Sequence, residues 1–215
     1  MSSADILTRL FNSASRVKII RLFLLNPAEV LSPAAICRRA KVSRVSGRRE
    51  IKLLKAIDFI KPKSEYIAIA TKNKKGLPRR VKAGKPRKKR ISSWKLNETF
   101  PLMLGLKNFV LDTVPLSKDQ LLKKIQRAGR LKLVILAGIF GEEDSSRVDI
   151  LAVGDGLKRG VLERAIKDIE AEVGKELTYA AFSTQDFLYR LGMYDKFIRD
   201  ILDYPHEKIL NKLGV

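Results

Sequence analysis

The run KNKKGLPRRVKAGKPRKKR at residues 72–90 limits what this chain can fold into more than any other stretch. It holds 11 basic residues, two glycines, two prolines and no acid. A segment with so little to bury cannot join a packed core, and we expect it to be disordered when free. Any folded domain that contains it must carry it as a projecting tip.

The charge of the chain is distributed unevenly. Residues 1–130 hold 32 Lys and Arg against 8 Asp and Glu, whereas residues 131–215 hold 12 against 15. The formal net charge of +21 therefore belongs to the N-terminal part. Such an asymmetry predicts nucleic acid or an acidic surface as the partner of that part alone.

Composition excludes several classes of site. The chain of 215 residues is long enough for one large domain or two small ones. The single cysteine, Cys37, and single histidine, His206, exclude an internal disulfide and a multi-cysteine or histidine-rich metal site. No apolar run or leader pattern predicts a membrane span or a signal peptide. We expect a cytoplasmic protein with no cofactor, no metal and no membrane association.

Two short helices are predicted first. Apolar residues recur at helical spacing from Val17 to Leu24, and Pro27 ends that helix. The second helix follows Ser32, whose side chain can cap the free amides, with Pro33 in the first helical position.

A third helix is predicted over residues 43–57, with Ser43 as its cap. Its apolar face carries Ile51, Leu54 and Ile57, and its opposite face carries Arg44, Ser46, Arg48, Arg49 and Lys52. Gly47 lies on the inward side, where glycine costs about 1 kcal/mol relative to alanine. We expect close approach of the second helix, in which Cys37 is a small core residue, to explain this glycine. Glu50 is expected to pair with a neighbouring arginine.

Two strands follow, over residues 65–71 and 91–96, and can pair as a hairpin. Helix, turn, helix and hairpin, carried mostly by VSRVSGRREIKLLKAIDFI, resemble the winged-helix transcriptional regulators over residues 1–99. The resemblance implies that helix 43–57 enters the major groove and that residues 72–90 form a basic wing on the backbone or minor groove. The wing equally suits RNA.

The residues expected to contact DNA lie on that helix and wing. They are Ser43, Arg44, Ser46, Arg48, Arg49, Lys52, Lys72, Lys74, Lys75, Arg79, Arg80, Lys82, Lys85, Arg87, Lys88, Lys89 and Arg90.

A connector at residues 100–129 begins with an apolar stretch that includes Met103, Leu106, Phe109 and Val110. It is too hydrophobic for a free linker, so it packs between domains or forms a dimer helix, and we expect a homodimer. Ser117 is expected to cap the basic helix that follows.

The last part, residues 130–215, predicts strands at 131–140, 147–153 and 176–182, a helix at 157–174 and a final helix capped by Ser183 or Thr184. This order resembles the nucleotidyltransferases, especially the minimal ones, over about residues 130–204. The chain is thus expected to be α+β: a winged helix-turn-helix followed by a small nucleotidyltransferase-like α/β domain.

The chain departs from that family where the chemistry lies. The family has Gly-Ser after its first strand, then two carboxylates flanking one residue on the next strand, and a third on a later strand. Here Gly138 is kept, but Ile139 replaces the serine and Arg147 the first carboxylate, while Asp149 matches the second. The third strand has no carboxylate. We expect Gly138, Arg147 and Asp149 to be a vestigial site, with Arg147 and Asp149 paired on one strand face and no catalysis.

The function expected from the sequence is a regulator that binds double-stranded DNA. Its C-terminal domain would serve dimerisation or effector sensing, with a nucleotide near Gly138 as the candidate effector. Two alternatives remain open: an RNA-binding or ribosome-associated protein, and an active metal-dependent nucleotidyltransferase. The acids Glu142, Glu143 and Asp144 are expected to form a solvated turn, and Tyr179, Phe182, Phe187 and Tyr189 to be core residues.

Overall fold

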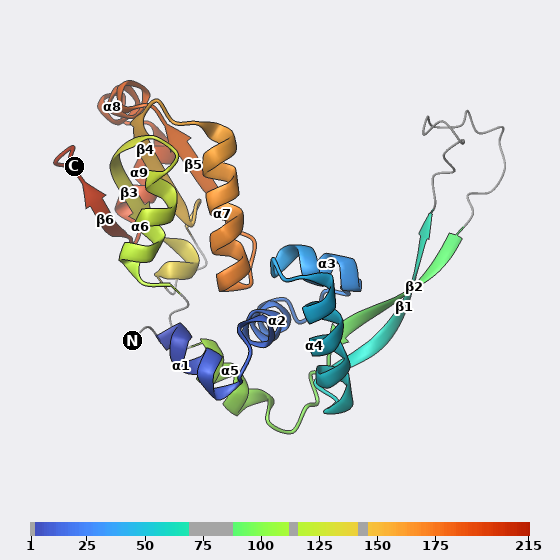
Figure 1. Cartoon of the computed structure of the whole chain (residues 1–215). Helices are drawn as coiled ribbons and strands as arrows, with labels where there is room; N and C mark the ends of the chain where they lie inside the picture. The colour runs from blue at the N-terminus through green and yellow to red at the C-terminus, as the bar shows by residue number, and fades with distance from the viewer. Residues whose placement is uncertain (1–2, 69–87, 112–115, 142–145) are drawn as a thin grey trace, which may run out of the picture. The chain divides into compact units, whose positions relative to one another are not determined.

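A computed structural model describes residues 3–68, 88–111, 116–141 and 146–215, and its fold is mixed α+β, as predicted (Figure 1). The chain divides into two compact units. The N-terminal unit is Ser13–Leu111, and the C-terminal unit is Met1–Asn12 together with Asp112–Val215. No helix within the described residues is both long and apolar enough to cross a membrane.

The N-terminal unit contains four described helices and a hairpin: α2 (Ala14–Leu25), α3 (Pro33–Arg39), α4 (Arg44–Ala56), β1 (Ile60–Ala68), β2 (Lys88–Leu96) and α5 (Met103–Leu111). Three of the helices begin after a serine that accepts a hydrogen bond from the amide three residues on. These serines are Ser13, Ser32 and Ser43. The predicted caps at Ser32 and Ser43 are therefore confirmed.

The core of this unit forms where α2, α3 and α4 meet, around the fully buried Phe23, Ile36 and Leu54. The predicted close approach of α3 to α4 is confirmed at Gly47. A Cβ atom added there would lie 2.3 Å from Cys37 Sγ, and Cys37 is itself buried. Only glycine leaves room for the sulfur at this crossing.

One residue of the predicted apolar face of α4 lies outside the core. Ile51 and Leu54 are buried, whereas the side chain of Ile57 is 51% exposed. The reason is that α4 ends at Ala56, so Ile57 is already the cap, and the chain turns away at Asp58 with φ of 59°.

The hairpin strands are longer than predicted. β1 and β2 pair antiparallel from Ile60 with Leu96 to Ala68 with Lys88. An isolated β-bridge adjoins them, in which Leu31 and Trp94 exchange two backbone hydrogen bonds of 2.8 Å. These bonds tie the base of the hairpin to the segment between α2 and α3.

The apolar connector forms α5, which packs on α2 through the buried Val110. Arg21 of α2 is 2% exposed, and its Nε and Nη2 donate to the Val110 carbonyl at 3.5 Å. Leu102 and Leu104, at the other end, remain 70% and 73% exposed.

The C-terminal unit contains α1 (Ser3–Leu10), α6 (Lys118–Gln126), β3 (Arg130–Leu136), a 3-10 turn η1 (Gly138–Phe140), β4 (Ile150–Asp155), α7 (Arg159–Val173), β5 (Tyr179–Phe182), α8 (Thr184–Gly192), α9 (Lys196–Asp203) and β6 (Glu207–Asn211). The predicted cap of α6 at Ser117 is confirmed, with Gln120 completing a capping box. Ser183 caps α8.

One four-stranded sheet organises this unit, in the order β5-β4-β3-β6. β4 and β5 run parallel, while β3 pairs antiparallel with β4 and β6. The side chains of Leu133 and Leu151 pack on Phe187 of α8 and Ile198 of α9. Their alternate neighbours on the strands are buried on the other face, which α6 and α7 cover (Figure 1). Both faces of the sheet are thus closed.

Three predictions for this unit were wrong in detail. The single final helix is two helices, because Tyr194 takes a left-handed φ of 54° and Asp195 caps a new helix. Strand β6 was not predicted. Of the four aromatic residues expected in the core, Phe187 is fully buried but Tyr189 is 68% exposed on α8.

Candidate nucleic-acid interface

Helix α4 presents a basic face to solvent and an apolar face to the core. Arg44, Arg48, Arg49 and Lys52 are exposed, whereas Gly47, Glu50, Ile51 and Leu54 are buried. The separation follows from the helical repeat, since the two sets alternate at spacings of three and four residues. The sequence-predicted cations of α4 are therefore brought together on one accessible surface.

The exposed face of α4 lacks compensating acids. Within the part of the chain that the structure describes, Arg44, Arg48, Arg49 and Lys52 form no ion pair. The one acid of α4 is Glu50, which is 3% exposed and points inward. The surface charge of this helix is consequently all positive.

Glu50 is held by the start of α2. Its Oε2 lies 2.7 Å from Arg16 Nε, and its Oε1 accepts a hydrogen bond of 2.9 Å from the Ser13 hydroxyl. Glu50 was expected to pair with a neighbouring arginine. It pairs instead with Arg16, 34 residues earlier, because its side chain leaves α4 on the buried side.

The two serines at the start of α4 bind each other. The Ser43 hydroxyl accepts from the Ser46 amide at 3.0 Å and donates to Ser46 Oγ at 2.9 Å. Their predicted position beside Arg44 on the accessible end of the helix is what the structure shows. The cap fixes the first turn, and with it the direction of Arg44.

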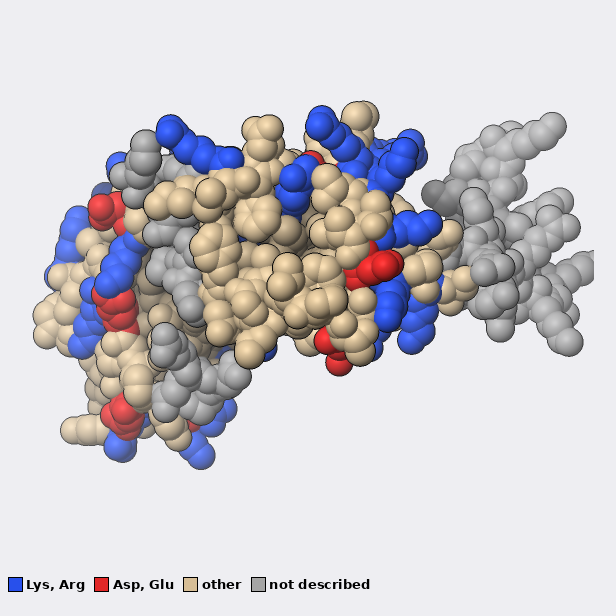
Figure 2. All heavy atoms as spheres, turned by 90° about the horizontal axis from the view of Figure 1, so that it is seen from below, with Lys and Arg blue, Asp and Glu red and all other residues tan. Residues whose placement is uncertain are grey.

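The predicted wing falls mostly outside the described residues. Three of its predicted contact residues, Lys88, Lys89 and Arg90, belong to strand β2. The others lie outside the described residues: Lys72, Lys74, Lys75, Arg79, Arg80, Lys82, Lys85 and Arg87. Figure 2 shows lysines and arginines gathered at one end of the described surface, with several acids between them.

Sequence reasoning missed three further cations of the N-terminal unit. Lys61 and Lys63 are exposed on β1, and Lys55 Nζ lies 5.8 Å from the centre of the Trp94 ring. Their spacing was visible, since Lys55 follows Lys52 by three residues and Lys61 and Lys63 alternate on a strand. The signal was lost because β1 was predicted to begin only at residue 65.

The second predicted site centres on Asp149, whose carboxylate binds backbone. Oδ1 accepts from the Ile139 amide at 3.0 Å, and Oδ2 accepts from the Thr178 amide at 2.7 Å. Gly138 fits against it with φ of 55°, and a Cβ there would lie 2.4 Å from Oδ1. Asp149 therefore fastens the turn after β3 to the start of β5.

The predicted Arg147–Asp149 pair is wrong. Arg147 Nε lies 2.5 Å from Asp200 Oδ2 of α9 instead. β4 begins at Ile150, so both residues precede the strand and its alternation does not apply to them. Glu142, Glu143 and Asp144 lie outside the described residues, and the described ones contain no group of three or more His, Cys, Asp or Glu placed to hold a metal.

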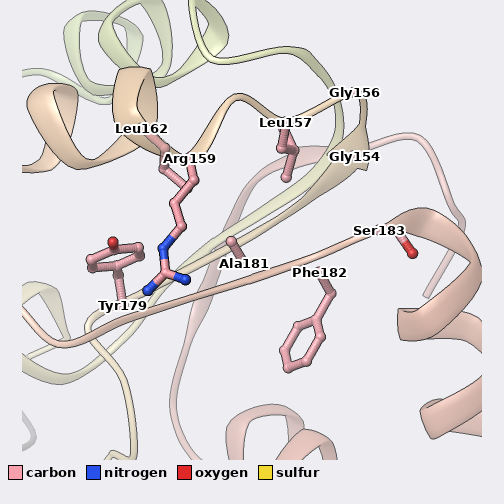
Figure 3. A pocket seen from close by; sticks show the side chains of 9 residues that line it. All are labelled: Gly154, Gly156, Leu157, Arg159, Leu162, Tyr179, Ala181, Phe182 and Ser183. Atoms are coloured by element: carbon pink, nitrogen blue, oxygen red, sulfur yellow. The ribbon is translucent and has the colours of Figure 1, made fainter.

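A groove of about 650 Å³ runs along the outer edge of β5. Figure 3 shows the Arg159 guanidinium and the Tyr179 ring directed toward each other across it. Gly154 and Gly156 line it at the far end of β4, whereas Gly138 lies near the start of β4. The groove is thus distinct from the Gly138 region where a nucleotide effector was expected.

Comparison with protein families, curated proteins and solved structures finds no match to this chain.

Proposed function

We propose that the protein is a sequence-specific regulator that binds double-stranded DNA through a winged helix formed by the N-terminal unit. α4 enters the major groove, and the basic run at residues 72–90 lies on the backbone or in the minor groove. The observation that carries the proposal is the exposed face of α4, where four cations form no ion pair with any residue that the structure describes, while Glu50 is buried.

The chemistry of that face suits DNA. Arginine can donate two hydrogen bonds to the major-groove edge of guanine, and lysine and arginine neutralise phosphates. A helix is the element that fits the major groove. Arg48 and Arg49 lie in the middle of the exposed face, so we assign them base contacts. Arg44 and Lys52, near the two ends, are assigned to phosphates.

The C-terminal unit is proposed to be a degenerate nucleotidyltransferase-like domain that acts in dimerisation or effector sensing. Both oxygens of the Asp149 carboxylate already accept backbone amides, and Arg147 is engaged with Asp200. Neither side chain is then available for phosphoryl chemistry. We propose that this domain has no transferase activity.

The protein is proposed to act as a homodimer through α5. Leu102, just before α5, and Leu104, within it, expose large apolar side chains, whereas Val110 of the same helix is buried. Sedimentation of the full chain and of a Leu104→Glu variant tests this. A dimer that the variant converts to monomer supports it, and a monomeric wild-type protein refutes it.

Selection of bound sequences from a random duplex pool tests the main proposal. Enrichment of a defined motif is expected, and a palindromic one would match a dimer. The alternative is RNA, which the acid-free run at residues 72–90 favours. Tighter binding to structured RNA than to any selected duplex would establish that alternative.

A further inference from the structure

The C-terminal unit has a second basic surface, in a groove of about 640 Å³ between α6 and α7. Each helix lines it with a row at spacings of three, four and seven residues: Gln120, Lys123, Lys124 and Arg127 from α6, and Val161, Arg164, Ala165 and Asp168 from α7. Residues at this spacing share one side of a helix. The groove is therefore built by two facing rows.

The cations of the α6 row are not balanced locally. Lys123, Lys124 and Arg127 form no ion pair with any residue that the structure describes. Asp168 is the one carboxylate among the described lining residues. This row stands out in a unit whose residues 131–215 carry more acids than bases. Like charges brought together without acids repel one another, and a polyanion relieves that repulsion.

We propose that this groove binds the sugar–phosphate backbone of nucleic acid as a second, sequence-independent contact. None of the described residues that line it has an aromatic side chain on which a base could stack. Lysine and arginine at successive turns of α6 match a chain of phosphates, which position a protein but carry no sequence. The inference rests on the proposed DNA-binding function, which it extends to the other unit.

Protection of lysines from acetylation separates the two ideas. The full chain is acetylated with and without excess random-sequence duplex, and each lysine is measured by mass spectrometry. Protection of Lys123 and Lys124, but not of Lys196 and Lys212 elsewhere in the unit, is expected. Protection of Lys52 alone refutes the groove and leaves the α4 proposal standing. Protection of Lys123 and Lys124 without Lys52 supports the groove and refutes the α4 proposal. Protection of none of these lysines refutes both proposals.

Two double variants with the same charge change provide the second test. Each phosphate neutralised contributes about 0.9 to the slope of log affinity against log salt. Lys123→Gln with Lys124→Gln is expected to lower that slope by about one to two units on every duplex sequence. Lys196→Gln with Lys212→Gln is the control and leaves it unchanged. Equal slopes for the two double variants, or a change in sequence preference in the first, would overturn the inference.

Discussion

Glu50 Oε2 lies 2.7 Å from Arg16 Nε, and this pair joins the buried side of α4 to the first turn of α2. The Glu50 side chain is 5% exposed and that of Arg16 is 20% exposed. The same contact holds Glu50, the only acid of α4, on the buried side of the helix and away from its exposed face. One interaction thus fixes the orientation of the helix and the sign of its surface charge.

Removal of this carboxylate is expected to destabilise the N-terminal unit. Glu50→Ala removes the buried carboxylate that Arg16 Nε and the Ser13 hydroxyl contact, which is expected to cost about 3 kcal/mol. The measurement is urea unfolding followed by fluorescence of Trp94, the single tryptophan, which lies in this unit. Glu98→Ala is the control, since Glu98 pairs with Lys95 at the surface and its loss costs less than about 1 kcal/mol. Equal losses in the two variants would contradict the structural role of Glu50.

The contact of Gly47 with Cys37 gives a second prediction. Gly47→Ala places a methyl group against Cys37 Sγ and is expected to cost about 1–3 kcal/mol by overpacking. Cys37→Ala removes the sulfur that the new methyl group would strike. Adding Gly47→Ala to Cys37→Ala is therefore expected to cost much less stability than adding Gly47→Ala to the wild-type protein. Gly105→Ala in α5 meets no atom within 4 Å and is expected to gain up to about 1 kcal/mol. Additive effects of the two core changes would show that the helices do not touch at this point.

Arg48→Ala and Arg49→Ala are expected to reduce discrimination between specific and random duplex. Loss of a bidentate contact to a base costs about 1–3 kcal/mol of discrimination. Competition binding at fixed salt measures it. Arg199→Ala, in α9, is the control, because Arg199 pairs with Asp203 in the other unit. If both variants weaken all sequences by the same factor, the two arginines contact phosphates.

The protein is expected to transfer no nucleotide with magnesium or manganese. Asp149→Ala is instead expected to destabilise the C-terminal unit by about 1.5–3 kcal/mol, because the backbone amides of Ile139 and Thr178 lose a charged acceptor. Label transfer from nucleoside triphosphates and thermal unfolding by circular dichroism are the two measurements. Turnover that disappears in a folded Asp149→Asn protein would establish an active site.

Shortening the hairpin tests the basic run. The last pair joins Ala68 to Lys88, so residues 69–87 can be replaced by an Asn-Gly turn that keeps every pair of the hairpin. The exchange removes 8 basic residues. Affinity for every duplex is expected to fall, and the salt slope to drop by several units of about 0.9 each. Sequence preference is expected to fall less, because α4 remains. An unchanged slope would place this run off the DNA and favour the RNA alternative.

Local rules predicted the helices of the N-terminal unit well. Ser32 and Ser43 cap helices because their effect acts within three residues. Features set by distant residues were missed. The partner of Glu50 is 34 residues away, and Arg147 finds Asp200 on a helix 53 residues later. The break between α8 and α9 depends on a left-handed tyrosine, Tyr194, which residue preferences disfavour.

The candidate site was predictable where it follows a helical repeat, as for Arg44, Arg48, Arg49 and Lys52. The exposure of Lys61 and Lys63 was not predicted, because it depends on where β1 begins, and the predicted strand began only at residue 65. Asp149 was singled out from the sequence because it matches the second carboxylate of the nucleotidyltransferase pattern. Its role as an acceptor for two amides depends on the path of β5, which the sequence around Asp149 does not contain.

The bridge between Leu31 and Trp94 restrains the angle at which the hairpin leaves the N-terminal unit. At about 3.3 Å per residue, a strand as long as β1 projects about 26 Å from its base. A tilt of about 10° at that base would move the far end by about 5 Å, more than the 3.4 Å by which successive phosphates of one DNA strand advance along the helix axis. In the proposed complex with DNA, these two backbone hydrogen bonds near the base of the hairpin would help to set where its far end meets the duplex.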